Sequence, residues 1–165
     1  MAGRLVSVNV GLPRKVEWYG RTVLTSIWKS PVEGRVRAEG VNLVGDGQAD
    51  LRVHGGPAKA VYAYAVEDYE WWTDEGYDVA PGTFGENFTV SGVDCTGAQP
   101  GDIWRIGTAV FMATQPRQPC FKLGIRMGTS EFVDRFDEAE RPGIYLTIVS
   151  AGDVGAGDEI TIERG

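Results

Sequence analysis

Short runs of alternating apolar and polar residues, separated by glycine, proline or aspartate, constrain the fold of this chain more than any other feature. The clearest runs are RLVSVNVG, RTVLTSIW, DIWRIG, TAVFMATQ, IYLTIVS and EITIER. A period of two is typical of strands that bury one face. The 23 glycines among 165 residues fit tight turns better than disorder, because aromatic and β-branched residues recur between them. The pattern therefore predicts a mainly β fold.

One long segment breaks the strand pattern and predicts the main helix. It is AKAVYAYAVEDYEWWTDEG, residues 58–76, and it ends at Gly76, a residue that commonly terminates a helix. One helical face would consist of Val61, Tyr64, Tyr69 and Trp72. The spacing of these four residues is the reason for the helix prediction.

A shorter helix is predicted for SEFVDRFDEAERPG, residues 130–143. Ser130 is a suitable N-cap, Phe132, Val133 and Phe136 provide a packing face, and Pro-Gly ends the segment. Few helices among many strands favour a closed or nearly closed β-barrel with a few short helices. A doubly wound sheet would need helices that alternate with strands throughout.

The size and charge of the chain limit the number of domains and the kinds of ligand that are expected. A chain of 165 residues is expected to form a single domain over residues 1–165. The net charge of −7 argues against nucleic-acid binding, although Lys59, Arg117, Lys122 and Arg126 leave room for a local basic pocket and a small anionic ligand. The sequence contains neither a signal-peptide core nor a membrane span, and its two cysteines form no disulfide framework. A cytoplasmic protein with reduced thiols is expected.

The segment QPRQPCFKLGIRMG places one thiol, Cys120, between two prolines and a run with several cations. Pro116 and Pro119 remove amide donors, so Cys120 is expected where a strand ends and not within a strand ladder. Nearby positive charge, and the free amides of a helical turn if one begins at FKLGIR, would favour a thiolate. Such a sulfur is reactive or binds metal; the alternative is an inert, buried cysteine.

The segment DGQADLRVHGGPAKAVYAY contains His54, the only histidine, followed by Gly55, Gly56 and Lys59 at the start of the predicted main helix. Helix amides and a lysine can hold an anion, and the glycines let a ligand approach the backbone. A plain turn between a strand and the helix, with a hydrogen-bonded histidine, explains the same residues.

A third cluster, PGTFGENFTVSGVD, places Glu86 and Asn87 before a short strand. Asn87 offers a donor and an acceptor that suit the edge of a heterocycle, whereas ordinary turn chemistry accounts for it equally well. Asp50 and Glu86 are candidate proton donors, with an exposed salt bridge or a turn contact as the preferred role for both.

Taken together, the HGG, GEN and PRxPC elements occur in the order that resembles the MOSC domain family, which is related to the C-terminal domain of molybdenum cofactor sulfurases. The pattern is most similar to the YiiM-like branch. The resemblance continues into RPGIYLTIVSAGDVGAGDEI, which is similar to the closing barrel strands of the family. Thr147 stands where relatives often have an arginine.

This resemblance implies a barrel-like fold that binds the molybdenum cofactor, a pterin with molybdenum. It implies that Cys120 provides sulfur to the metal and acts as the catalytic residue, which suits the preference of soft metals for thiolate. Cofactor-binding positions would be His54, Gly55, Lys59, Asn87 and Arg117. Cys95 lacks such a setting and is expected to be structural.

The resemblance further implies an oxidoreductase that reduces N-hydroxylated compounds, such as hydroxylamines and N-hydroxylated bases, to amines. The sequence has no flavin, iron–sulfur or nicotinamide motif, so electrons are expected from a separate reductase protein. The alternative is a non-catalytic carrier of the molybdenum cofactor, or of sulfur as a Cys120 persulfide. A third possibility is a barrel that has lost its ligand and serves only as an interaction domain.

Overall fold

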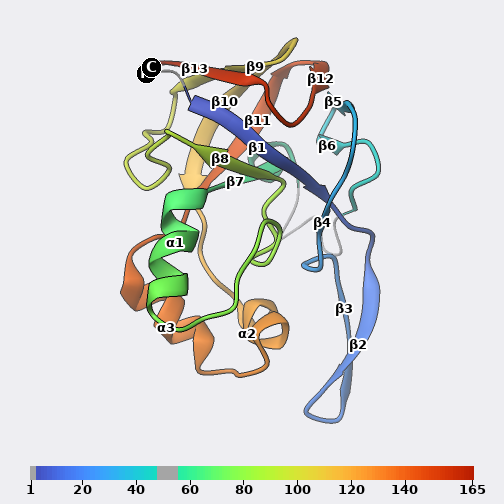
Figure 1. The fold of residues 1–165 in the computed structure, drawn as a ribbon. Helices are drawn as coiled ribbons and strands as arrows, with labels where there is room; N and C mark the ends of the chain where they lie inside the picture. Colours follow the sequence, from blue (N-terminus) through green and yellow to red (C-terminus); the bar gives the residue numbers. More distant parts are fainter. Residues whose placement is uncertain (1–2, 48–55) are drawn as a thin grey trace.

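The computed structural model describes residues 3–47 and 56–165 and contains a closed β-barrel (Figure 1). The main sheet has the strand order β13-β9-β10-β11-β7-β8-β1-β4, and β13 also pairs with β1, which closes seven strands into the barrel. The strands are β1 (Gly3–Val10), β4 (Ser30–Pro31), β7 (Val61–Ala65), β8 (Phe88–Ser91), β9 (Ile103–Ile106), β10 (Ala109–Pro116), β11 (Ile144–Ser150) and β13 (Glu159–Glu163). The prediction of a mainly β barrel is confirmed.

The alternating runs of the sequence form the barrel strands. Along β10, buried and half-buried residues alternate from Ala109 to Thr114, as expected for a strand with one face in the core. The barrel core includes Leu5, Phe88, Trp104, Phe111 and Leu146, all less than 1% exposed. Cys95 also belongs to this core, and burial raises the pKa of its thiol well above the ordinary value. Its setting matches the structural role that the sequence predicts.

The prediction of a helix over residues 58–76 is wrong for its first half. Residues Val61–Ala65 form β7, which pairs with β11 in antiparallel and with β8 in parallel orientation. All five residues are buried, because the barrel covers one face of β7 and a second aromatic core covers the other. A strand buried on both faces shows no alternation in sequence. Only α1 (Val66–Asp74) is helical, and Lys59 lies in a short 3₁₀ turn, Pro57–Lys59, instead of at a helix start.

The helices gather at one end of the barrel (Figure 1). They are α1, α2 (Phe121–Met127) and α3 (Phe132–Ala139). With β7 they enclose the second core, which contains Tyr64, Trp72, Phe84, Phe132 and Phe136. The shorter predicted helix is present as α3, but its N-cap is Glu131 and not Ser130. No helix among the described residues is long and apolar enough to cross a membrane.

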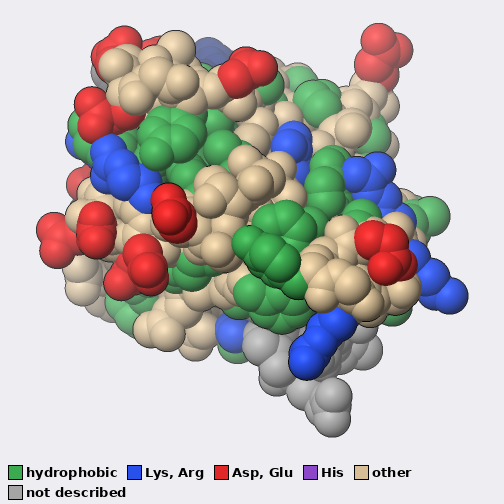
Figure 2. Space-filling view, turned by 90° about the horizontal axis from the view of Figure 1, so that it is seen from below, with side chains coloured by type: hydrophobic (Ala, Val, Ile, Leu, Met, Phe, Trp, Pro, Cys, Tyr) green, Lys and Arg blue, Asp and Glu red, His purple; other side chains and the backbone are tan. Residues whose placement is uncertain are grey.

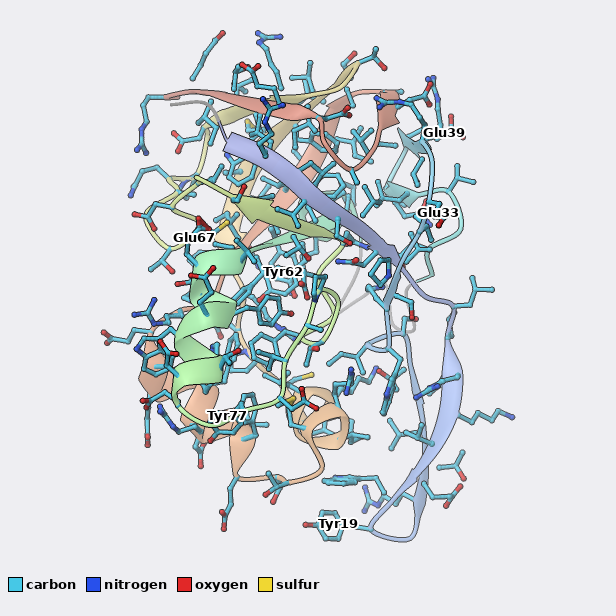
Figure 3. All side chains as sticks on the ribbon, in the orientation of Figure 1. Tyr19, Glu33, Glu39, Tyr62, Glu67 and Tyr77 are labelled. Carbon is cyan, nitrogen blue, oxygen red and sulfur yellow. The ribbon has the colours of Figure 1, made fainter. Side chains whose placement is uncertain are left out.

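Two smaller sheets complete the described part of the chain. One contains β5 (Val36–Glu39), β6 (Asn42–Leu43) and β12 (Gly152–Val154). The other is the hairpin of β2 (Arg14–Trp18) and β3 (Arg21–Thr25), which projects from the barrel beside the helices, with Tyr19 at its tip (Figures 1 and 3). The run RTVLTSIW is thus a strand only as far as Thr25, and residues 26–29 leave the hairpin toward the helical end of the barrel.

A fully buried carboxylate fixes the loop that precedes β8. Glu86 accepts hydrogen bonds from the Tyr69 hydroxyl (2.6 Å), the Gly82 amide (3.0 Å) and the Thr89 hydroxyl (2.8 Å). Burial raises the pKa of Glu86 above its ordinary value, and these three donors oppose the rise. The expected turn contact of Glu86 is therefore present, whereas an exposed salt bridge is excluded by its burial.

The hydroxyl hydrogens of this network have fixed directions. The Tyr69 hydroxyl accepts from the Phe84 amide (3.0 Å), and the Thr89 hydroxyl accepts from the side-chain amide of Asn9 (3.0 Å). Each hydroxyl therefore directs its own hydrogen toward Glu86. Each carboxylate oxygen of Glu86 therefore faces a donor and must accept. A glutamine has only one accepting oxygen, because its other terminal group is an NH₂ donor.

We expect Glu86→Gln to lower the free energy of unfolding by about 1–3 kcal/mol, because its NH₂ group meets a donor at either oxygen position. In a Tyr69→Phe background no hydroxyl occupies one of these positions, so the NH₂ group fits there and the same substitution costs less. Denaturant unfolding of the wild type, both single variants and the double variant measures this coupling. If the double variant loses as much free energy of unfolding as the two single variants together, the proposed directions of the hydroxyl hydrogens are wrong.

Candidate functional site

Cys120 lies between the end of a barrel strand and the start of a helix. β10 ends at Pro116, and Cys120 is the N-cap of α2, with extended backbone angles (φ −129°, ψ 177°). Its carbonyl accepts the Leu123 amide at 3.0 Å, and the residue is half-buried. The prediction that Cys120 follows a strand is confirmed, as is the helical turn that begins after it. Neither Cys95 nor Cys120 is in a disulfide.

The thiol lines a cleft at the helical end of the barrel, which we call the inner cleft. Its open space is about 590 Å³, including solvent at the mouth. It is lined by Thr25, Ser26, Ile27, Lys29, Asp46, Gly47, Lys59, Tyr62, Phe84, Gly85, Asn87, Arg117, Cys120, Lys122 and Tyr145. Four of the predicted site residues, Lys59, Asn87, Arg117 and Cys120, therefore meet in one place. His54, Gly55 and the candidate proton donor Asp50 lie outside the described residues.

Positive charge dominates the inner cleft, although the whole chain carries −7. Its described lining contains four cationic side chains, Lys29, Lys59, Arg117 and Lys122, and one carboxylate, Asp46. Lys29 forms a buried ion pair with Asp46 at 2.6 Å. A cationic excess within a partly enclosed cleft attracts an anionic ligand more strongly than the same charges do on an open surface.

Arg117 is deeply enclosed, with 9% of its surface exposed. Its guanidinium lies 4.9 Å from the centre of the Tyr62 ring and 5.5 Å from that of Phe136, and it donates to the Phe84 carbonyl. No carboxylate among residues 3–47 and 56–165 pairs with it. Figure 3 shows Tyr62 between the barrel and the helices. Aromatic rings thus compensate Arg117 for its lost hydration and leave its charge available to a ligand.

Asn87 is held by the protein through all of its polar groups. Its NH₂ group donates to the Asn9 carbonyl (3.2 Å) and to Asp46 (2.9 Å), and its side-chain oxygen accepts the Tyr62 amide (3.0 Å). Both donors that could read a heterocycle are therefore used within the protein. In this arrangement Asn87 positions Asp46, which in turn holds Lys29.

Ser26 is a site residue that the sequence did not indicate. Its hydroxyl is buried in the inner cleft and has no hydrogen-bond partner within the described residues. A buried hydroxyl without a partner is costly, so Ser26 is a position where a polar ligand group would gain a hydrogen bond. Ser26 and Lys29 follow a hairpin far from Cys120 in sequence, and no motif connects the two segments.

A second hollow, which we call the outer groove, adjoins the inner cleft. Its open space is about 1600 Å³, including solvent at the mouth. It is lined by Lys59, Thr96, Gln115, Pro116, Arg117, Gln118, Pro119, Cys120, Phe136, Asp137, Glu140, Arg141, Pro142 and Tyr145. Lys59, Arg117, Cys120 and Tyr145 line both hollows and form the wall where they meet. Cys120 is therefore accessible from two sides.

Of two further positions on β11, Tyr145 belongs to this wall and Thr147 does not. Burial raises the pKa of the Tyr145 hydroxyl, and the charge of Arg117 only partly offsets this, so the hydroxyl stays protonated at neutral pH. Thr147, two positions along β11, pairs with Met112 on β10 and is not part of the described lining of either hollow.

The MOSC domain model matches residues 50–161 of this chain. The uncharacterized protein YflK of Bacillus subtilis is 36% identical over 159 residues, which are 96% of this chain and 72% of YflK. Protein YiiM of Escherichia coli is 33% identical over 86% of this chain and 65% of its own length. A protein of Gibberella moniliformis named reductase is 29% identical over 97% of this chain, which spans only 29% of that protein.

Solved structures of YiiM proteins are also similar to this chain. YiiM of Geobacillus stearothermophilus has a TM-score of 0.79 and 29% identity, and the match covers 98% of this chain and 75% of that structure. YiiM of Escherichia coli has a TM-score of 0.74 and 25% identity, over the whole of this chain and 71% of that structure. The barrel, the cationic cleft around Cys120 and these matches lead to one conclusion: the chain belongs to the MOSC domain family and is similar to its YiiM members.

Proposed function

We propose that this protein binds the molybdenum cofactor and reduces N-hydroxylated compounds to amines. The observation that carries the proposal is the position of the Cys120 thiol in a cleft with four cationic side chains. Membership of the MOSC family, which is associated with the molybdenum cofactor, supports it. The relative named reductase supports an oxidoreductase, although this chain spans only a part of that protein.

The residues of the inner cleft fit such a cofactor. A cysteine thiolate is a soft donor that suits a sulfur-bound metal centre, and Cys120 is the half-buried thiol of the cleft. Arg117, Lys59 and Lys122 would bind the phosphate of the pterin, and the hydroxyl of Ser26 would find a partner in one of the cofactor's polar groups. His54 and Gly55 stay proposed cofactor-binding residues.

When bound, the cofactor supplies the two electrons of the reaction R–NHOH + 2e⁻ + 2H⁺ → R–NH₂ + H₂O. The protein positions the cofactor and the substrate at the wall between the two hollows. Tyr145 contributes a protonated hydroxyl to this wall, and Arg117 contributes a fixed positive charge. Both groups favour an oxygen that gains electron density as its bond to nitrogen breaks.

The proposal includes a separate reductase protein as the electron donor and a cytoplasmic location. Among the described residues no three or more His, Cys, Asp or Glu side chains are grouped so that they could hold a metal ion. A thiolate at Cys120 requires a compartment that keeps cysteines reduced. The proposed ligands are the cofactor and small N-hydroxylated molecules; nucleic acid is not among them.

We expect Cys120→Ala to reduce the molybdenum content of protein from a cofactor-producing host by at least roughly tenfold, because the metal loses a protein ligand. Cys95→Ala is the matched control, since it removes a thiol from the barrel core and leaves the cleft intact. Metal and pterin analysis after dialysis measures both. If Cys120→Ala retains wild-type molybdenum, the ligand assignment is wrong and a carrier of cofactor or sulfur becomes the better explanation.

We expect Lys122→Gln to weaken retention of the pterin by about fivefold to thirtyfold, because a charge-assisted hydrogen bond to phosphate contributes about 1–2 kcal/mol. The difference between the variant and the wild type should shrink as the salt concentration rises, because salt screens the charge that the variant lacks. Lys15→Gln, on the exposed hairpin, removes the same charge away from the cleft and serves as the control. Pterin content after dialysis at several salt concentrations measures the effect. Equal retention in both variants would exclude Lys122 from the phosphate site.

A further inference from the structure

We propose that the outer groove binds the organic substrate and prefers one that carries a positive charge remote from its N-hydroxyl group. The inference deepens the proposed function and rests on it for the chemistry.

Cys120 lies in the wall between the inner cleft and the outer groove, so a substrate could reach it from either hollow. If the cofactor's phosphate occupies the cationic inner cleft, the outer groove is the remaining approach to Cys120. Its cavity volume of about 810 Å³ accommodates a small organic molecule. The half-buried rings of Tyr145, Pro119 and Pro142 lie along its lining and suit a planar apolar body.

The lining of the outer groove contains charges of both signs on different elements. Lys59 and Arg117 belong to the wall near Cys120, whereas Asp137 and Glu140 line only the groove. Both carboxylates are exposed at the end of α3, and neither forms an ion pair with a described residue. A molecule that fills the groove therefore meets positive charge near Cys120 and negative charge at α3.

The third cation of the groove does not cancel this difference. Arg141 is paired with Asp68 at 2.6 Å and lies 4.6 Å from the centre of the Trp71 ring. In the view from below, acidic side chains are most numerous on the left, the side of α1 and α3 in Figure 1, where basic side chains also lie among them (Figure 2). The groove thus matches an aromatic N-hydroxylated compound with a cationic group at its far end.

The first test is binding of two probes of nearly equal shape, benzamidine, which is cationic, and benzamide, which is neutral. We expect benzamidine to bind the cofactor-free protein about threefold to tenfold more tightly at low salt, followed by NMR titration. The Asp137→Asn/Glu140→Gln variant should lose this preference and keep its affinity for benzamide. Higher salt should also reduce the preference.

The matched control is Asp134→Asn/Glu138→Gln, which makes the same charge change on exposed positions of α3 that are not part of the groove lining. It should keep the preference for benzamidine. Equal affinity for the two probes in the wild type, or an equal loss of preference in the control, would overturn the inference. None of the four positions is in a hydrophobic core, so all variants should fold.

Turnover of loaded protein separates this inference from the proposed function. With 4-(aminomethyl)phenylhydroxylamine, the Asp137→Asn/Glu140→Gln variant should show a KM raised about threefold or more and an unchanged kcat, whereas 4-methylphenylhydroxylamine should show no change. Probe preference without any turnover would support the groove and overturn the reductase. Turnover without any charge preference would support the reductase and overturn the groove.

Discussion

The burial of Arg117 is the constraint on which the site depends. Its guanidinium contacts Tyr62 from β7, Phe136 from α3 and the Phe84 carbonyl from the loop before β8. The barrel, the helices and that loop therefore all converge on one charge. Because Arg117 follows the end of β10 and precedes Cys120, the contacts that enclose it also fix the path of the chain to the thiol. A charge enclosed by rings and carbonyls, with no carboxylate among its described partners, is suited to an anionic ligand.

β7 explains why the structure has two cores and why its sequence predicts a helix. One face of the strand belongs to the barrel core, with Val61 and Ala63, and the other to the aromatic core, with Tyr62 and Tyr64. Period-two alternation correctly predicts β1, β10 and β11, since each has one face on the core and the other nearer solvent. A strand covered on both faces shows no alternation of apolar and polar residues. Val61 and Tyr64, three positions apart, also share a helical spacing with Tyr69 and Trp72 of α1.

The sequence predicts part of the site because three of its elements are local motifs. Cys120, Arg117 and Lys59 meet as expected, and Cys95 is in the core. Ser26 and Lys29 could not be predicted, because tertiary structure alone places the segment after the hairpin against Cys120. The roles of Asn87 and Glu86 also depend on distant partners, Asp46 and Tyr69, which hydrogen-bond geometry reveals and sequence spacing does not.

The central claim is that the cofactor binds with Cys120 at the metal. The most direct measurement is the rate of alkylation of Cys120 by iodoacetamide, followed by peptide mass spectrometry, in cofactor-free and cofactor-loaded protein. Cys95 is 1% exposed and provides an internal reference that should stay unmodified in both. Our account predicts that Cys120 reacts in the cofactor-free protein and is protected at least roughly tenfold when loaded. Equal rates in the two forms would contradict it.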